Sequence, residues 1–479
     1  MLKVHNTLAG RKEPFEPLVP GSVRMYVCGV TVYDECHIGH ARSALVFDVM
    51  RNYLRHRGYA VTFVKNFTDV DDKIINRAAQ EQVKPSDIVE RYLQAYRRDM
   101  ERLGVNPPDI EPRATEHIGE IIRLIETLIA KGHAYRLDDD VYFEVGTYPA
   151  YGRLSKRKAE DLLAGARVEV DERKRHPMDF ALWKSSKAGE PAWKSPWGPG
   201  RPGWHIECSA MSMHHLGETF DIHGGGLDLI FPHHENEIAQ SCSATGKEFA
   251  QYWVHNGFVE INREKMSKSL GNFFTIREVF EKSDWSQEIT GEIVRYFLLT
   301  NHYRSPLDFS DQGLREAKYA LDGFYDLFNR LKETVQEEET GNETFRHAIE
   351  RTRVAFEEAM DDDFNTPAAL AELQGFRSDV NKLLKSRLPN KTRKQARELF
   401  RALGSVLGLF QMDDWRFNVD LSDTGVAGLT AEQIESKIAE RNEARRMKDF
   451  KKADEIRDFL KSNDIIIEDR PDGTSRWKR

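Results

Sequence analysis

Apolar and polar positions near the N-terminus change from a strand-like to a helix-like pattern and back. Residues 23–28 form a short apolar run, and apolar side chains then recur at helical spacing from residue 39 to about residue 57. Gly58 ends this helical pattern, and residues 59–67 form a second β-rich run. The pattern predicts a strand–helix–strand unit, the start of a parallel, doubly wound sheet that binds ligands at the carboxyl ends of its strands.

The sheet pattern is interrupted in the middle of the chain and then resumes. Helical periodicity runs from Lys73 to about Ala130. It is followed by β-rich, charge-rich and Pro/Gly/Trp-rich stretches, at 138–147, 153–175 and 189–203. Two strand-like runs with a helix between them then return, at 220–222, 253–261 and 232–242. We therefore expect an α/β fold, a Rossmann-type doubly wound parallel sheet split by a connective insertion, with segments 1–120, 121–200 and 201–260.

Helical patterns dominate the last third of the chain. Residues 314–331 keep one apolar stripe at three-and-four spacing, so an α-helical bundle is expected over 313–410. Residues 411–429 are polar and contain glycine, which indicates a linker. Thr430 followed by Gln433 is a capping-box pattern that begins a small C-terminal domain, 430–479.

Composition limits the partners and the compartment. The chain has 479 residues, with 70 Lys and Arg against 78 Asp and Glu, so a nucleic acid would be met by local basic patches. It has four cysteines, no apolar leader at its start, and no uninterrupted apolar run of the roughly 18 residues that a membrane span needs. We expect a cytoplasmic protein with free thiols and no membrane partner.

The segment His37-Ile38-Gly39-His40 lies between the predicted strand and its helix. Free backbone N–H groups and the helix dipole favour a phosphate at this position. Gly39 lets the backbone approach a ligand closely, and His37 and His40 share a helix face from which both rings can donate to phosphate oxygens. A chance tetrapeptide at a helix start is the simpler alternative.

A second candidate phosphate-binding segment, Lys265-Met266-Ser267-Lys268-Ser269, follows the predicted strand at 253–261. The ammonium groups of Lys265 and Lys268 can close over a polyphosphate and neutralise the charge that develops as pyrophosphate leaves. By itself the segment is more simply a solvated basic loop. The two segments together, in this order, resemble the signature of class I aminoacyl-tRNA synthetases without a departure in either.

Histidine and cysteine gather in one window of the chain, which indicates a metal site. Its members are His205, His214, His215, His223, His233, His234, His255, Cys208 and Cys242. On a helix, His233 and Glu237 are about 40° apart, so one ion can bind both, whereas Cys242 lies about 180° from His233 and is expected only to pack. Spacing alone leaves a site of four ligands as a hypothesis, with His234 or Cys36 as rivals: Cys28, Cys208, His233 and Glu237.

Several segments resemble the cysteinyl-tRNA synthetases of class I over almost the whole chain. Three of them match the segments that carry this family's zinc ligands, and one matches in the bundle: MYVCG at 25–29, PGWHIECS at 202–209, FPHHENE at 231–237 and DDDFNTP at 361–367. The resemblance implies one zinc ion per chain on Cys28, Cys208, His233 and Glu237. It also implies that 261–312 is the KMSKS loop and stem-contact region, and that 430–479 binds the anticodon.

The same resemblance implies ATP-dependent ligation of L-cysteine to its tRNA through a cysteinyl-adenylate, by a monomer. The ATP phosphates, bridged by Mg²⁺, would be bound and stabilised by His37, Gly39, His40, Lys265 and Lys268. Zinc would select the substrate thiolate over the serine hydroxyl, two groups that an ordinary pocket separates poorly. The candidate substrate-binding residues are Cys28, Trp204 as a pocket wall and Asp228 as the partner of the ammonium group, and the last two are equally well explained as structural.

The C-terminal domain carries two candidate anticodon contacts. Residues 441–479 contain 12 Lys and Arg against 9 Asp and Glu, so their local charge is +3. Phe450 can stack on an unpaired base, and Asp454, one turn further on the predicted helix, can accept from a base edge. The alternative is a solvated amphipathic helix in which Phe450 belongs to the core.

Two other functions fit parts of the pattern. A related cysteine ligase would activate cysteine in the same way, pass it to an amino sugar and need no anticodon-binding domain. A non-catalytic, zinc-dependent RNA-binding protein would carry both phosphate segments without using them. Intact His37, His40, Lys265 and Lys268 favour an enzyme, and the bundle with its basic C-terminal domain favours tRNA as the acceptor.

Overall fold

The computed structural model of the chain describes residues 1–156, 173–261, 264–265, 273–333, 343–384, 388–415, 417, 431–447, 449–462, 465–469 and 475–478. The chain divides into two compact units, one made of residues 1–278 and 292–411 and the other of residues 279–291 and 412–479. No helix in the described part of the chain is long and apolar enough to cross a membrane.

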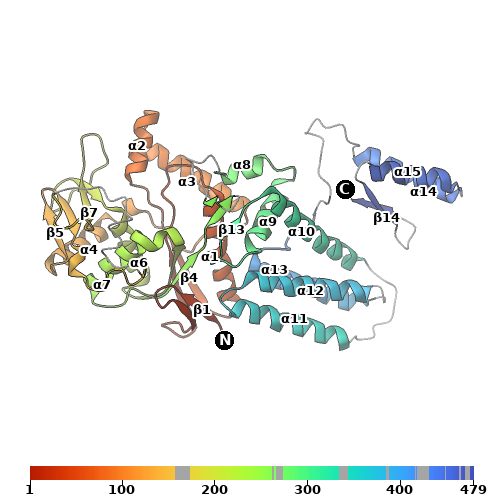
Figure 1. The fold of residues 1–479 in the computed structure, drawn as a ribbon, viewed down its shortest axis with the longest axis horizontal. Helices are drawn as coiled ribbons and strands as arrows, with labels where there is room; N and C mark the ends of the chain where they lie inside the picture. The colour runs from red at the N-terminus through yellow and green to blue at the C-terminus, as the bar shows by residue number, and fades with distance from the viewer. Residues whose placement is uncertain are drawn as a thin grey trace. The chain divides into compact units, whose positions relative to one another are not determined.

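A four-stranded parallel sheet organises the first unit (Figure 1). Its order is β10-β9-β3-β4, with bounds Ala250–Asn256, Phe220–Gly226, Ser22–Val27 and Ala60–Lys65. Helix α1 (Ile38–His56) joins β3 to β4, and α7 (Glu235–Thr245) lies between β9 and β10 in the chain. The predicted doubly wound sheet is confirmed, and its strand order changes direction between β3 and β9, where such sheets bind ligands.

Three strand predictions were wrong in detail. Two strands that were not predicted, β1 (Lys3–Asn6) and β2 (Arg11–Pro14), precede β3. They form a hairpin that is too short and too exposed to leave an apolar pattern in the sequence. Strand β9 continues through three glycines that look like a loop in the sequence. A Cβ on Gly224 would stand 2.3 Å from the ring of Phe47, so the strand can pack against α1 there only with glycine.

The third correction concerns the run predicted at 253–261, which is two strands separated at Gly257. Strand β11 (Val259–Ile261) leaves the parallel sheet and joins a small three-stranded sheet of order β12-β11-β13. The partners are β12 (Glu264–Lys265) and β13 (Leu307–Asp308). A Cβ on Gly257 would stand 2.6 Å from the carbonyl oxygen of Ser305, which explains the glycine at the break.

The chain between β4 and β9 forms helices and an antiparallel sheet. The elements, in order, are α2 (Asp72–Glu81), α3 (Pro85–Arg102), a 3-10 turn (Ala114–Glu116), α4 (Ile118–Ala130), β5 (Ala134–Leu137), β6 (Asp140–Phe143), a 3-10 turn (Val145–Thr147), β7 (Phe180–Ser185), β8 (Gly200–Pro202) and α6 (Trp204–Leu216). The sheet order is β5-β6-β7-β8. We expected one β-rich stretch here, and β7 and β8 were missed because their pairing is non-local.

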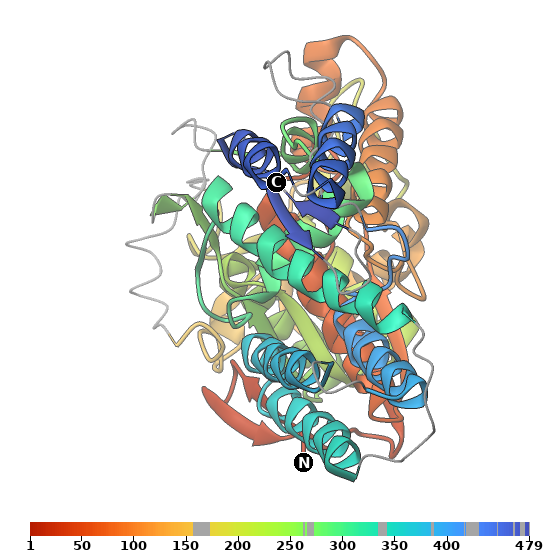
Figure 2. The same ribbon diagram turned by 90° about the vertical axis from the view of Figure 1, so that its right-hand side faces the viewer.

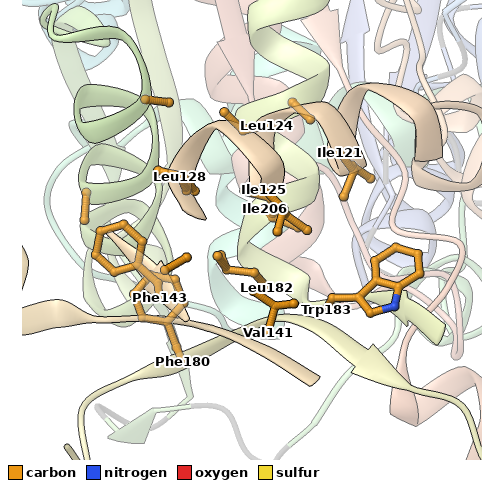
Figure 3. Close-up of a cluster of buried hydrophobic side chains, with 14 of the residues drawn as sticks. Ile121, Leu124, Ile125, Leu128, Val141, Phe143, Phe180, Leu182, Trp183 and Ile206 are labelled. Carbon is orange, nitrogen blue, oxygen red and sulfur yellow. The ribbon is translucent and has the colours of Figure 1, made fainter. Parts of the chain in front are cut away.

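Helix α4 lies over this sheet and closes a hydrophobic core (Figure 3). One face of the helix supplies Ile121, Leu124, Ile125 and Leu128. The strands supply Val141, Phe143, Phe180, Leu182 and Trp183, and α6 adds Ile206. Because α6 also packs against the parallel sheet, its side chains connect this core to the cavity described below.

The chain continues with helices α8 to α13, whose bounds are Ile276–Glu281, Gln287–Leu299, Asp311–Lys332, Glu343–Asp361, Thr366–Leu384 and Asn390–Leu407. The division between the two units falls within α8 and α9, and α10 to α13 belong to the first unit. Helices α10 to α13 pack side by side as the predicted bundle (Figures 1 and 2). Buried Arg295 of α9 ties this region to the sheet: it pairs with Asp48 of α1 and donates to the carbonyl oxygens of Leu407 at 2.6 Å and Gly104 at 2.7 Å.

The acidic segment after α11 joins the bundle to the N-terminal hairpin (Figure 2). The fully buried carboxylate of Asp363 accepts from the backbone N–H of His5 at 2.8 Å, from the hydroxyl of Tyr303 at 2.8 Å and from the guanidinium of Arg304 at 2.7 Å. Burying a charged carboxylate is favourable only when its oxygens are paired in this way, so the segment fixes how the bundle meets the sheet.

The second unit contains α14 (Ala431–Arg446), α15 (Phe450–Ser462) and the hairpin β14 (Ile466–Asp469) and β15 (Ser475–Lys478). Its core is formed by isoleucine and leucine side chains, Ile434, Ile438, Ile456, Leu460 and Ile465. Phe450 is 62% exposed, so the alternative that placed it in the core was wrong. The carboxylate of Asp454 pairs with Arg457 at 3.0 Å, and both side chains are exposed.

Candidate active site and metal centre

A cavity of about 460 Å³ opens at the carboxyl ends of the parallel strands. Cys28, Lys65, Gly226 and Asn256, from the ends of β3, β4, β9 and β10, all line it. The cavity therefore lies at the sheet edge that the strand pattern indicated. Gly29 allows the strands to approach there, because a Cβ on it would stand 1.5 Å from the carbonyl oxygen of Asn66.

His37 and His40 form one wall of the cavity at the start of α1. Their rings stack with centroids 3.7 Å apart. His37 Nδ1 accepts from the backbone N–H of Gly39 at 3.0 Å, and His40 Nδ1 accepts from the backbone N–H of His37 at 3.2 Å. With Nδ1 occupied as an acceptor, each neutral ring carries its proton on Nε2. The two rings thus offer N–H donors beside a helix terminus that favours anions.

The lysine segment is described only in part. The backbone of Lys265 ends β12 beside the cavity strand β11, with Lys265 paired to Glu260. Lys268 and the rest of the segment from Met266 to Asn272 lie outside the described residues. Phe273, the first described residue after the segment, lines the cavity and contacts the ring of His37 at 5.1 Å between centroids. Phe273 therefore lies beside the candidate phosphate-binding histidines.

Four donors converge at the other end of the cavity, beyond Cys28. The Cys28 sulfur lies 3.6 Å from that of Cys208, 3.4 Å from His233 Nε2 and 3.4 Å from Glu237 Oε1. His233 Nε2 and Glu237 Oε1 are 3.1 Å apart. The structure thus brings together the four residues that the sequence hypothesis named, from the end of β3, from α6, from the turn Ile230–His234 and from the start of α7.

Burial controls the protonation of this cluster. It raises the pKa of the Cys28 thiol well above its usual value and also raises the pKa of Cys208. It lowers the pKa of His233 to about 3, so the imidazole is neutral at physiological pH. A neutral ring with a lone pair, two thiols and a carboxylate are donors that a divalent cation of borderline softness can use.

Two further histidines, which the sequence hypothesis did not assign, hold the cluster in place. His205 Nδ1 lies 3.0 Å from His233 Nδ1, and burial lowers the pKa of His205 to about 3. His233 Nδ1 can therefore donate to His205 and keep its Nε2 lone pair facing the cluster. His223 Nε2 lies 2.9 Å from Glu237 Oε2, which leaves Oε1 directed at the thiols. The sequence signal for His205 and His223 was that both lie in the window where histidines gather.

The rival ligands, His234 and Cys36, differ in their distance from the donor cluster. His234 Nε2 lies 4.0 Å from Glu237 Oε1, and a second possible donor set contains His234 and His223 with Cys28 and Glu237. His234 Nδ1 is 2.8 Å from His255 Nε2, while its Nε2 has no hydrogen-bond partner among the described residues. Cys36 belongs to neither set.

Cys242, which the helical spacing had set aside, also belongs to neither donor set and packs against the core. The helix predicted at 232–242 begins with a π-helical turn, Ile230–His234, before α7. The angular separation assumed for His233 and Cys242 was therefore only approximate. His233 and Glu237 are still in contact, because they lie one turn apart where the π-helical turn joins α7.

Trp204 and Asp228 both line the cavity. The Trp204 indole stacks on the His233 ring with centroids 4.2 Å apart, which places an apolar wall against the metal-ligand candidate. Asp228, in the 3-10 turn Leu227–Leu229 after β9, is exposed to solvent at the cavity edge. An exposed carboxylate at that position can pair with a ligand's ammonium group.

The chain is similar to proteins whose activities are known. Residues 14–319 match the family of class I (C) tRNA synthetase catalytic domains, and residues 355–411 match the DALR domain family. A cysteine–tRNA ligase of Geobacter metallireducens is 56% identical over 488 residues, with 100% of this chain and 99% of the relative covered. One from Alkalilimnicola ehrlichii is 55% identical over 480 residues, with both chains covered completely.

Solved structures support the fold. A methionyl-tRNA synthetase of Mycobacterium tuberculosis in complex with methionyl-adenylate aligns with 81% of this chain and 93% of its own length, at a TM-score of 0.60 and 16% identity. The full-length curated relatives identify the narrower group within that fold. The chain belongs to the class I aminoacyl-tRNA synthetases, as a member of the cysteine–tRNA ligase family.

Proposed function

We propose that the cavity activates L-cysteine with ATP and that a zinc ion on Cys28, Cys208, His233 and Glu237 selects the substrate by its thiol. The observation that carries this proposal is the convergence of four buried donors at one end of the cavity. Tetrahedral zinc with sulfur, nitrogen and oxygen ligands holds those ligands about 3.3–3.8 Å apart. The observed separations of 3.1 to 3.6 Å fit that spacing.

The donor chemistry also fits zinc. Glu237 is fully buried beside two thiols, and its closest described side-chain partners are the Cys28 thiol and the imidazoles of His223 and His233, not a lysine or an arginine. A cation would compensate the carboxylate and favour the thiolates that burial otherwise opposes. Bound zinc would also favour a substrate thiolate over a serine hydroxyl, which stays protonated.

The protein side chains position the other reacting groups. Trp204 would pack against the substrate, and Asp228 would pair with its ammonium group. The Nε2–H groups of His37 and His40 would donate to ATP phosphates, with Mg²⁺ bridging the phosphates and Lys265 and Lys268 closing over them. The cysteine carboxylate attacks the α-phosphate and expels pyrophosphate, and a tRNA ribose hydroxyl then displaces AMP from the cysteinyl-adenylate. Neither step needs a nucleophile from the protein.

Amino-acid-dependent ATP–pyrophosphate exchange tests the substrate assignment. With each of the twenty amino acids in turn, cysteine alone should support rapid exchange, and serine should fall below it by about 10⁴-fold, as expected for a site that binds one distinctive group. Comparable exchange with serine would exclude the metal as the selecting element. Exchange with none of the twenty would contradict activation in this cavity.

We also propose that the second unit binds the anticodon of cysteine tRNA. The net charge of +3 over residues 441–479 and the exposed Phe450 ring support this role, because basic groups attract phosphates and an exposed aromatic face can stack on a base. Relatives that match the chain from end to end favour tRNA over an amino sugar as the acceptor and an enzyme over a non-catalytic binding protein. The enzyme would act as a monomer in the cytoplasm, where its free thiols stay reduced.

Deletion of residues 430–479 separates activation from charging. The truncated chain should keep cysteine-dependent exchange within about twofold of the full-length protein and lose efficient aminoacylation of tRNA. If aminoacylation survives at the full-length rate, the second unit does not bind the anticodon. If exchange is lost as well, the unit is needed for the integrity of the catalytic part.

A further inference from the structure

A second histidine cluster lies outside the active-site cavity, between two helices. His117 immediately precedes α4, while His214 and His215 occupy the last turn of α6. Their ring centroids form a nearly equilateral triangle, with sides of 5.3 Å, 5.1 Å and 4.7 Å. One ring nitrogen from each lies within 4.8 Å of the others. The proposed aminoacylation site uses none of these residues.

The innermost ring is already oriented for a ligand. His117 is buried, and its Nδ1 lies 2.8 Å from the carbonyl oxygen of Arg113. Since a carbonyl can only accept, Nδ1 carries the proton and the Nε2 lone pair points away from the backbone. A histidine that donates one ring N–H to a carbonyl while the other nitrogen faces outward is the usual arrangement of a metal ligand.

The spacing of the rings also suits one ion. His117 Nε2 and His215 Nε2 are 3.1 Å apart. Two imidazole nitrogens on tetrahedral zinc stand about 3.3 Å apart, and the centroids of their rings stand about 5.2 Å apart, when each zinc–nitrogen bond is about 2.05 Å long. The three observed centroid separations lie close to that value. The rings meet edge-on instead of stacking, so their nitrogens can converge.

We propose that His117, His214 and His215 hold a second divalent cation of the class that imidazole prefers, zinc foremost, with cobalt and nickel as substitutes. Glu120, in the first turn of α4, is within reach as a further donor, because its Oε1 lies 3.9 Å from His214 Nδ1 and also pairs with Arg123 at 2.6 Å. The site shares no ligand with the thiol cluster.

The two sites differ in affinity and in effect. The second has no thiolate, and His214 is 48% exposed, so its ion exchanges with solvent and binds more weakly than the buried one. The ion ties the start of α4 to the end of α6, the helix whose first turns carry Trp204 and Cys208. Because it binds the folded chain alone, it raises the melting temperature as its concentration increases.

Metal stoichiometry of the full-length protein decides this. After dialysis against buffered zinc, atomic emission should find one ion per chain at low free zinc and two at micromolar free zinc. His215→Gln and His214→Gln should each lose the second ion and keep the first, whereas Cys208→Ser should lose the first and keep the second. His347→Gln, on the exposed face of α11, is the matched control and should hold both.

Two further readouts make the result independent of activity. Cobalt added after the buried site is filled with zinc should give visible absorption without a thiolate charge-transfer band, and zinc should raise the melting temperature of the wild type but not of His215→Gln. One ion per chain at every free zinc concentration up to about 100 μM, or a second ion retained equally by His215→Gln and His214→Gln, would overturn the proposal.

Discussion

The thiol cluster at the cavity and the outer face of the second unit, for which we propose roles in cysteine and tRNA binding, differ in burial. Cys28, Cys208, His233 and Glu237 are buried, and each is held by neighbouring side chains. The second unit instead leaves large side chains in solvent, with Met447 at 74%, Phe450 at 62% and Phe459 at 44% exposure. The first region is fixed before a ligand arrives, whereas the second offers a surface that a flexible partner can cover.

This contrast matches what each region would have to distinguish in the proposed function. Cysteine differs from serine in one atom, so discrimination needs donors that are desolvated and oriented in advance. A tRNA loop presents several bases and phosphates, so recognition can be shared among exposed contacts that each contribute modestly. Substitutions in the cluster should therefore remove function, and substitutions on the second unit should weaken it by degrees.

The largest effect is expected at the thiol cluster. Cys208→Ser and His233→Ala should lower zinc from one tightly held ion per chain to nearly none and abolish cysteine-dependent exchange, because each removes one of the four ligands of the proposed site. Metal analysis of the purified proteins at low free zinc measures this directly. Cys242→Ser and Cys36→Ser are the matched controls and should keep both the ion and the exchange. Equal zinc in the Cys208→Ser and Cys242→Ser proteins would contradict the ligand assignment.

A somewhat smaller loss is expected at the phosphate end of the cavity. Lys268→Ala should slow cysteinyl-adenylate formation by about 100-fold or more while leaving cysteine affinity nearly unchanged, since in the proposed mechanism the ammonium stabilises charge that appears only as pyrophosphate leaves. Pre-steady-state adenylate formation is the measurement. Lys247→Ala, which removes a surface lysine paired with Glu218, should have no effect. A Lys268→Ala rate within about twofold of wild type would remove this residue from the mechanism.

The sequence predicted the cavity wall and the four metal-ligand candidates for a local reason. His37 and His40 sit at a helix start that glycine and apolar spacing mark clearly, and His233 and Glu237 are neighbours on one turn. These features depend on residues close together in the chain. Cys28 and Cys208 were candidates from their places in the sequence, and the family resemblance then favoured this set of four over the rivals His234 and Cys36.

The residues that orient the cluster could not be predicted in this way. His205 reaches His233 from α6, and His223 reaches Glu237 from β9, so both contacts depend on how a helix and a strand cross. The strand prediction at 220–222 did not include the three glycines of β9, because the packing of Phe47 against Gly224 is also non-local. The cluster of histidines in the sequence indicated a site in this part of the chain, but only the fold shows which residue each ring contacts.

The orienting histidines give the next prediction. His205→Phe keeps the aromatic contacts with Phe180 and Trp204 but removes the acceptor for His233 Nδ1, so zinc affinity should fall by about 10- to 100-fold. Competition with a chelator of known affinity measures the change. His255→Phe is the control, because His255 contacts His234 and not His233. If His255→Phe weakens zinc more than His205→Phe does, His234 is the ligand and His233 is not.

Losses that can be as small as about 5-fold are expected on the second unit. Stacking of a base on an aromatic ring contributes about 1–3 kcal/mol, so Phe450→Ala should lower kcat/KM for tRNA by about 5- to 150-fold while cysteine-dependent exchange is unchanged. Asp454→Ala should cost less, because this carboxylate already pairs with Arg457 at 3.0 Å in the absence of RNA. Phe450→Trp should restore charging, since it retains an exposed ring.

Phe459 offers the control that separates base stacking from a general loss of surface. It lies on the same helix as Phe450, nine residues further on and therefore about 180° round the helix axis, with 44% of its side chain exposed. If Phe450 contacts the anticodon, Phe459→Ala should leave kcat/KM for tRNA within about twofold of wild type, because one helix cannot present both faces to the same base. Equal losses in the two variants would instead show that the unit depends on both rings for its own stability, and a thermal melt of each variant would then show matching decreases. A decrease in charging confined to Phe450→Ala, without a change in melting temperature, is the result that assigns this face of α15 to the tRNA.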